Sequence, residues 1–185
     1  FFIPLPFMIF YFSGTGNSKW VAEQLTGVLK EQLIFIPEAM RNAVTHYELA
    51  DKEKVGFVFP IYSWGPPPIV LQFLQGLSLS NYHSQYFFFV CSCDDTGLAQ
   101  QVFCDAVAAK GWRCDAGFSV TMPNNYVLLP GFDVDSKEVE KRKLDDAVQR
   151  VAEVGEMIEE RTKSFQCNEG RFPFIKTKLI NPLFI

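Results

Sequence analysis

At residues 8–18 the chain reads Met8-Ile9-Phe10-Tyr11-Phe12-Ser13-Gly14-Thr15-Gly16-Asn17-Ser18. The apolar first half predicts a buried strand, and a helical pattern begins at Lys19. The loop between them leads into a helix N-terminus, where free backbone N–H groups and the positive end of the helix dipole attract anions. Gly14 and Gly16 let the backbone turn sharply and approach a phosphate closely. The sequence therefore predicts a phosphate-binding loop, with neutral donors from the other four side chains: Ser13, Thr15, Asn17 and Ser18.

Two other phosphate loops do not match this stretch. A P-loop requires Gly-x-x-x-x-Gly-Lys-Ser/Thr, and a dinucleotide-binding loop requires a third glycine where this chain has Lys19. The pattern that remains, Ser/Thr-x-Thr-Gly-x-Ser/Thr, resembles the FMN-phosphate loop of the flavodoxin family over its whole length, from Ser13 to Ser18. The resemblance implies FMN as the cofactor. The alternative is an ordinary βα turn that binds nothing.

The composition limits the class of protein. The chain has 185 residues, of which 48% are hydrophobic, so it is long enough for one domain with a full core. A net charge of −4 argues against a nucleic-acid partner, and no apolar run approaches the ~20 residues of a membrane helix, so we expect no membrane insertion. Five cysteines fit no disulfide framework and favour a cytoplasmic protein, and Cys91-x-Cys93 alone lacks the ligands of a metal centre.

Apolar runs alternate with amphipathic stretches, which predicts βαβ units and a parallel sheet. The fold prediction is α/β, a flavodoxin-like doubly wound sheet of five parallel strands in the order 2-1-3-4-5, with helices on both faces. The strands are expected at residues 8–12, 33–36, 55–59, 86–91 and 112–121, and the helices at 18–31, 69–77, 98–110 and 136–163. These elements make one flavodoxin-like FMN-binding domain, 8–163, after an extension or artefact at 1–7 and before an apolar and basic tail at 164–185.

A ligand of such a sheet binds beyond the carboxyl ends of the strands, near the switch between the first and third strands. The loops after the third, fourth and fifth strands, at 60–68, 92–97 and 123–126, are therefore expected to meet the phosphate loop. Ser63-Trp64-Gly65 is similar to the flavodoxin loop in which a Trp stacks on the isoalloxazine ring and the next glycine faces flavin N5. The alternative for Trp64 is a surface aromatic residue in a rigid proline turn.

The loop Cys93-Asp94-Asp95-Thr96-Gly97 resembles the second flavin loop of the family, which carries an acidic residue and a Tyr coplanar with the ring. Here Gly97 and Leu98 stand where that Tyr would be, so this face is either open or covered by Tyr126. Asp94 and Asp95 also suit a turn or a helix cap. The residues predicted to bind the cofactor are Ser13, Gly14, Thr15, Gly16, Asn17, Ser18, Tyr62, Ser63, Trp64, Gly65, Ser92, Cys93, Asp94, Asp95, Gly97 and Tyr126.

The predicted function follows from the cofactor, because the sequence shows no general acid, base or nucleophile pattern. A phosphate loop without a cation, on an acidic protein, disfavours a reduced anionic flavin and so predicts a low-potential electron carrier between redox proteins. The resemblance implies a ferredoxin-type iron–sulfur protein or a reductase as the partner. One alternative is a flavodoxin-like oxidoreductase that uses NAD(P)H, a quinone or a porphyrin, and another is an interaction domain without a cofactor.

The tail at residues 164–185 mixes basic and apolar side chains. The proline-rich loop and this tail resemble a branch of flavodoxin-like proteins in which a bacterial-type ferredoxin domain follows the flavin domain, although the ferredoxin cysteines are absent here. The chain is then either a truncated fusion or the companion of a separate iron–sulfur protein. Alternatively, the tail docks on its own domain or on a second copy in a homodimer.

Overall fold

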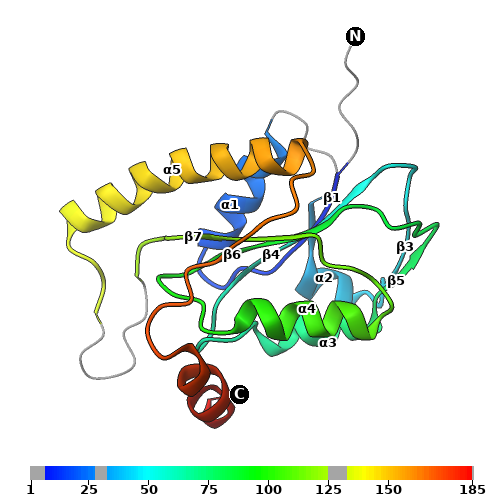
Figure 1. Ribbon diagram of the computed structural model, residues 1–185. Coiled ribbons are helices and arrows are strands. Elements are labelled where there is room, and N and C mark those ends of the chain that lie inside the picture. Colours follow the sequence, from blue (N-terminus) through cyan, green and yellow to red (C-terminus); the bar gives the residue numbers. More distant parts are fainter. Residues whose placement is uncertain (1–6, 28–32, 125–132, 185) are drawn as a thin grey trace.

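The computed structural model describes residues 7–27, 33–124 and 133–184. In this part of the chain, six parallel strands form the main sheet, in the order β2-β1-β4-β6-β7-β8 (Figure 1). A second parallel sheet contains β3 and β5 alone. The strands are β1 (Phe7–Tyr11), β2 (Leu33–Phe35), β3 (His46–Glu48), β4 (Lys54–Pro60), β5 (Ser78–Ser80), β6 (Phe87–Ser92), β7 (Ala116–Val120) and β8 (Phe165–Gln166).

Helices cover both faces of the main sheet. Figure 1 shows α1 and α5 on one face and α2, α3 and α4 on the other. The α-helices of the described residues are α1 (Asn17–Thr26), α2 (Ile36–Arg41), α3 (Pro68–Gly76), α4 (Ala99–Ala109) and α5 (Lys137–Glu159). After β8 the chain forms a π-helical stretch, Ile175–Ile180, and a 3₁₀ turn, Asn181–Leu183. We call residues 164–183 the C-terminal segment.

The core has two layers because side chains alternate along each strand. On β6, Phe87 and Phe89 belong to the layer under α2, α3 and α4, whereas Phe88 and Val90 belong to the layer under α1 and α5. All four side chains are buried, as expected for a parallel strand covered on both faces. The first layer is built around rings whose neighbouring centroids lie 5.0–6.4 Å apart: Phe10, Phe57, Phe59, Phe73, Phe87, Phe89 and Phe103.

The predicted order of five strands is confirmed, since β2, β1, β4, β6 and β7 are neighbours in that sequence. The predicted strand number is wrong, because β8 pairs with β7 as a sixth strand. β8 comes from the stretch predicted to be a tail, and Gly117 pairs there with Phe165. A strand of two residues is too short to produce an alternating pattern, so it cannot be predicted from the sequence.

Several predicted boundaries also shift. The helix expected at 18–31 ends at Thr26, because Gly27, with φ of 52°, forms its C-cap, and residues 28–32 lie outside the described part. The strand expected at 112–121 is shorter, at Ala116–Val120. The last helix ends at Glu159 rather than at 163.

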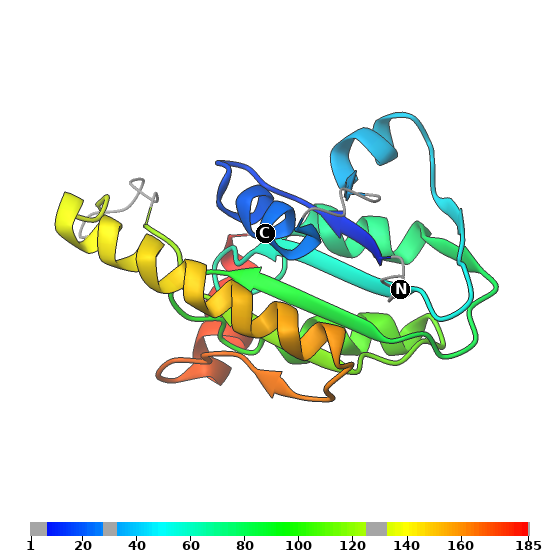
Figure 2. The same ribbon diagram turned by 90° about the horizontal axis from the view of Figure 1, so that it is seen from above.

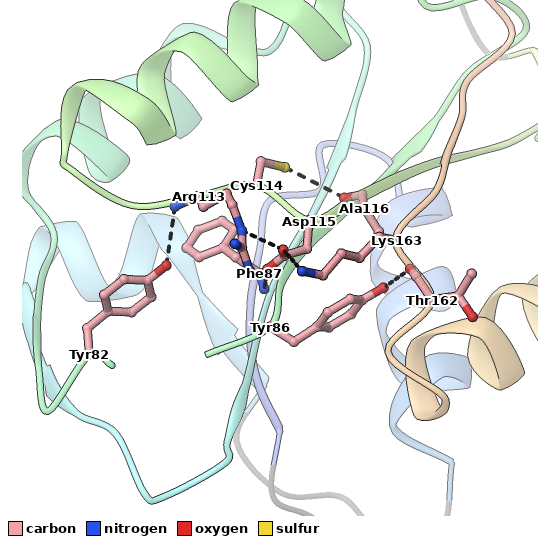
Figure 3. Close-up of polar contacts among 9 residues, drawn as sticks. All are labelled: Tyr82, Tyr86, Phe87, Arg113, Cys114, Asp115, Ala116, Thr162 and Lys163. Carbon is pink, nitrogen blue, oxygen red and sulfur yellow. Dashed lines mark hydrogen bonds and ion pairs between the residues drawn. The ribbon is translucent and has the colours of Figure 1, made fainter. Parts of the chain in front are cut away.

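Asp115 lies at the amino edge of the main sheet, directly before β7. Its buried carboxylate accepts a hydrogen bond from the Phe87 N–H at 3.2 Å and lies 2.7 Å from Arg113 Nε and 3.5 Å from Lys163 Nζ (Figure 3). These contacts join the starts of β6 and β7 to the chain that leaves α5. Asp115 therefore supports the fold, at the end of the strands opposite to the predicted cofactor loops.

The carboxyl edge carries those loops and the C-terminal segment. Figure 2 shows the central strand arrows pointing toward the side on which the red helical turns of the C-terminal segment lie. Within the described residues, no helix is both long and apolar enough to cross a membrane.

Candidate functional site

The predicted phosphate loop enters α1 through a glycine in a left-handed conformation. Gly16 is the N-cap with φ of 107°, and its N–H donates to Ser13 Oγ at 3.1 Å. Gly16 offers no side-chain cap, and the first turn of α1 holds no acidic residue. The positive end of the helix dipole is thus not neutralised by a carboxylate of that turn, which suits an anion. Gly14, Thr15 and Gly16 are exposed at the tip of the loop.

The two last residues of this loop contact the protein instead. Ser18 Oγ and Ser92 Oγ share a buried hydrogen bond of 2.7 Å, and Asn17 Nδ2 donates to the Pro123 carbonyl at 3.1 Å. These bonds attach the phosphate loop to the end of β6 and to the chain after β7. Ser18, Asn17 and Ser92 were predicted as cofactor contacts, and their hydrogen bonds in the structure give them a role in joining the loops.

Tyr62, Ser63, Trp64 and Gly65 form a tight turn at the end of β4. Tyr62 and Gly65 exchange two backbone hydrogen bonds, at 2.9 and 3.0 Å, around Ser63 and Trp64, which have φ of 46° and 64°. Positive φ at both central residues defines a type I′ turn, a conformation that favours Asn and Gly. The Gly65 carbonyl, expected to face flavin N5, therefore already accepts one hydrogen bond from the Tyr62 N–H.

The turn and the phosphate loop are in contact. The ring of Tyr62 meets Phe12 edge-on at 6.0 Å, and a Cβ on Gly14 would lie 2.7 Å from the Tyr62 hydroxyl oxygen. Only a residue without a Cβ allows this approach. The Tyr62 side chain remains 43% exposed, and its burial on the other side raises the pKa of its hydroxyl. The structure thus brings together the first two predicted loops.

The acidic residues of the loop after β6 are paired with lysines. Asp94 lies 2.9 Å from Lys143 of α5, and Asp95 lies 2.6 Å from Lys176 of the C-terminal segment. Lys143 also contacts Asp135 at 2.8 Å, and this hydrogen bond lowers the pKa of Asp135. The two carboxylates therefore fasten this loop to α5 and to the C-terminal segment, whatever they contribute to a bound flavin.

The C-terminal segment supplies site residues that the sequence reasoning missed. Thr177 contacts both the Trp64 carbonyl and the Leu98 N–H, and Asn181 contacts the carbonyls of Tyr62 and Ser63. A signal was present in the sequence, because Thr177 and Asn181 are polar residues four apart in an otherwise apolar and basic stretch. Both are buried in the structure. Helical spacing of that kind places both side chains on one face.

Three thiols lie behind the same loops. Hydrogen bonds with Cys167 and Cys93, together with burial, raise the pKa of the Cys91 thiol. All three are free cysteines, and Cys167 belongs to the C-terminal segment. Among the described residues, no group of three or more His, Cys, Asp and Glu side chains is placed to hold a metal ion. Tyr126, the remaining predicted site residue, lies outside the described residues.

The chain belongs to the flavodoxin domain family, whose sequence pattern matches residues 8–120. That span contains the described phosphate loop, the Tyr62–Gly65 turn and the loop after β6, and the family binds flavin, usually FMN. The fold is accordingly flavodoxin-like. No curated protein matches the chain significantly.

Solved structures with similar chain traces are distant in sequence. The Trp repressor binding protein from Bacillus subtilis is 17% identical, over 77% of this chain and 96% of its own, with a TM-score of 0.40. Rubredoxin oxygen:oxidoreductase from the anaerobe Desulfovibrio gigas is 16% identical, over 83% of this chain and 37% of its own, with a TM-score of 0.43.

Proposed function

We propose that this protein binds FMN at the carboxyl edge of its sheet and carries electrons between redox proteins. The start of α1 is the main support, because its N-cap is a left-handed glycine and its first turn holds no acid. The FMN phosphate is a dianion, so it gains from the helix dipole and from backbone N–H groups at this point. The exposed tip Gly14-Thr15-Gly16 is the surface that this phosphate would contact.

The isoalloxazine ring belongs beside the Tyr62–Gly65 turn in this proposal. Trp64 offers an aromatic face for stacking, and Tyr62 links the turn to Gly14. When bound, FMN supplies the redox chemistry, and the chain binds and orients it. Pro66 has no N–H to donate, whereas the Gly65 carbonyl retains a second lone pair for a donor of the cofactor.

We propose an electron carrier rather than an oxidoreductase with its own substrate, and the position of Thr177 supports this choice. An oxidoreductase needs space on the flavin for a second substrate, and the sequence left that space open at Gly97 and Leu98. Thr177 packs against this loop, since a Cβ on Gly97 would lie 2.5 Å from its Oγ1, and in our proposal it restricts the space for a second substrate. As redox partners we propose a ferredoxin-type iron–sulfur protein or a reductase, following the family resemblance, and as location the cytoplasm.

Purified protein tests this proposal directly. We expect the absorbance spectrum of bound oxidised flavin, and a separate reductase should reduce the protein while NAD(P)H alone reduces it negligibly. Steady NAD(P)H oxidation by the protein alone would favour the oxidoreductase. Colourless protein that takes up no added FMN would overturn the cofactor assignment and leave an interaction domain.

A further inference from the structure

We propose that the C-terminal segment forms a third wall of the cofactor site, with Lys176 as the positioning residue for Trp64. Lys176 covers one face of the Trp64 indole, so that a flavin ring stacks on the other face. Thr177 and Asn181 hold the turn that carries Trp64. The role of Lys176 in flavin stacking rests on the proposed function. The position of the C-terminal segment as a wall rests only on contacts within the chain.

The first observation is that two side chains hold three successive carbonyl groups of the turn. Asn181 Nδ2 donates to the Tyr62 carbonyl at 3.2 Å and to the Ser63 carbonyl at 2.9 Å. Thr177 Oγ1 donates to the Trp64 carbonyl at 2.8 Å. The left-handed conformation of Ser63 and Trp64 is unfavourable for residues with a Cβ, so it persists only where surrounding contacts impose it. The C-terminal segment provides such contacts.

The second observation is that glycines make room for these two side chains. A Cβ on Gly65 would lie 2.7 Å from Asn181 Nδ2, and one on Gly97 would lie 2.5 Å from Thr177 Oγ1. The same Thr177 oxygen accepts a hydrogen bond from the Leu98 N–H at 2.8 Å. Thr177 thus joins the turn after β4 to the loop after β6. From the C-terminal segment, Thr177 and Asn181 reach into these loops, and both are buried.

The third observation concerns the charge at Trp64. Lys176 Nζ lies over the indole, 5.2 Å from its centroid, and 2.6 Å from Asp95 Oδ2. The Lys176 and Asp95 side chains are only 20% and 24% exposed, so the ion pair is held in a fixed place. A cation over an aromatic face is attracted to it and restrains the ring. In this proposal, the flavin ring stacks on the opposite face of Trp64.

The test compares two lysines of the C-terminal segment that lie two positions apart in the sequence, Lys176 and Lys178. Lys178 is exposed, and Lys178→Met removes the same charge as Lys176→Met without touching Trp64. Fluorescence titration of the apoprotein should show Lys176→Met weakening FMN and riboflavin binding by the same factor, roughly tenfold. An equal factor is expected because the contact concerns the ring and not the phosphate. Lys178→Met and Lys176→Arg should stay within about twofold of the unmodified protein, since arginine keeps the cation over the ring.

Equal dissociation constants for Lys176→Met and Lys178→Met would overturn the role of Lys176. Failure of the unmodified protein to bind any flavin would overturn the proposed function and, with it, that role. The wall is tested separately by amide hydrogen exchange of the apoprotein, in which Thr177→Val should speed exchange at Leu98 and Gly65. Unchanged exchange at both amides would overturn the wall even if flavin binds.

Discussion

Ser63 and Trp64 both have a left-handed backbone conformation, so the side chain predicted to stack on the flavin, that of Trp64, lies on a strained turn. Each left-handed residue with a Cβ costs about 1–2 kcal/mol, and the turn residues suited to this geometry are Asn and Gly. The neighbouring Gly65 and Pro66 do not relieve this cost, because the positive φ values fall on the two residues before them. Strain of this kind is concentrated at functional sites, where surrounding contacts maintain it. Here the hydrogen bonds from Thr177 and Asn181 are those contacts.

Thr15→Ala tests the phosphate position. A hydroxyl that donates to a charged group contributes roughly 1.5–3 kcal/mol, so the variant should weaken FMN binding by that amount while riboflavin binding changes little. Isothermal titration with both ligands measures the two affinities. Equal losses for FMN and riboflavin would contradict the phosphate assignment. Ser18→Ala is a poorer test, since it breaks the buried bond to Ser92 and therefore acts on stability.

Trp64→Ala tests the stacking position. Aromatic stacking on a planar heterocycle contributes roughly 1–3 kcal/mol, and FMN and riboflavin should both lose that amount. Trp112→Ala is a suitable comparison, because Trp112 packs on Tyr82 and Phe87 away from the predicted loops. An unchanged flavin affinity in Trp64→Ala would remove this residue from the site. Both affinities are read from quenching of flavin fluorescence.

At the scale of elements, the strands that are buried on both faces of the sheet were the ones whose positions the sequence predicted best. β4 and β6 lie within one residue of their predicted bounds, because their apolar runs are continuous and end at recognisable turns. α2, β3, β5 and β8 were missed, because these short elements mix polar and apolar residues without a periodic pattern, whereas the equally short β2 is a continuous apolar run and was predicted. Their existence depends on neighbours, as when β8 pairs with β7.

For the candidate site as well, local sequence patterns could be recognised, whereas contacts between distant segments could not. The loops after β1, β4 and β6 were found because each carries unusual residues directly after a strand. The partners of Asp94 and Asp95 were not found, because Lys143 and Lys176 lie far along the chain and surface lysines carry no local signal. The spacing of Thr177 and Asn181 is visible in the sequence, but the partners of these residues, such as Ser63 for Asn181, follow only from the packing of distant segments.

Lys54 and Glu159 join the start of β4 to the end of α5. Lys54 is fully buried, and its Nζ lies 2.7 Å from Glu159 Oε2 on a side chain that is 50% exposed. Glu159→Gln leaves a buried ammonium without this carboxylate, so we expect a loss of about 1–2 kcal/mol in the free energy of unfolding. The loss is below the ~3–5 kcal/mol of a fully buried pair, because solvent reaches Glu159. Urea denaturation measures it, with exposed Glu156→Gln as the matched control.

The deficit of Glu159→Gln should depend on pH. Burial lowers the pKa of Lys54, and Glu159 partly restores it. A lysine whose pKa is lower in the folded protein binds fewer protons there than in the unfolded chain, so stability rises with pH between the two pKa values. Without Glu159 that rise begins at a lower pH, and the deficit should therefore shrink as the pH rises toward the ordinary lysine pKa of about 10.4. A deficit that stays constant over this rise in pH would contradict the explanation.

At the scale of the whole molecule, we expect the amino edge of the sheet to contribute to stability and the carboxyl edge to contribute to ligand binding. At the amino edge, Asp115 with Phe87, Arg113 and Lys163 joins β6, β7 and the chain after α5 (Figure 3). The carboxyl edge holds the glycine-rich loops, the strained turn and the C-terminal segment. Open parallel sheets bind ligands at the carboxyl edge, so stability and flavin affinity should respond to different substitutions.

Asp115→Ala tests this separation. Removing the buried carboxylate leaves the Phe87 N–H without its side-chain acceptor, which should lower the free energy of unfolding by about 1–3 kcal/mol. The dissociation constant of FMN should remain that of the unmodified protein, because no residue of the carboxyl edge is touched. Asp105→Ala, on the exposed side of α4, is the control and should change neither quantity. A weaker FMN affinity in Asp115→Ala would show that the two edges are coupled.

FMN itself should stabilise the whole domain, because its loops come from both halves of the sheet and from the C-terminal segment. A ligand that binds only the folded state adds about 2.7 kcal/mol at a hundredfold excess over its dissociation constant. For a chain of this length, such a gain corresponds to a rise of roughly 5–10 °C in the midpoint of thermal unfolding. Calorimetry should give the same rise in the midpoint for FMN and riboflavin when each is present at the same multiple of its dissociation constant. At equal low concentrations, FMN should raise the midpoint more than riboflavin, because its phosphate strengthens binding. A midpoint unaffected by saturating FMN would mean that the three loops bind no flavin.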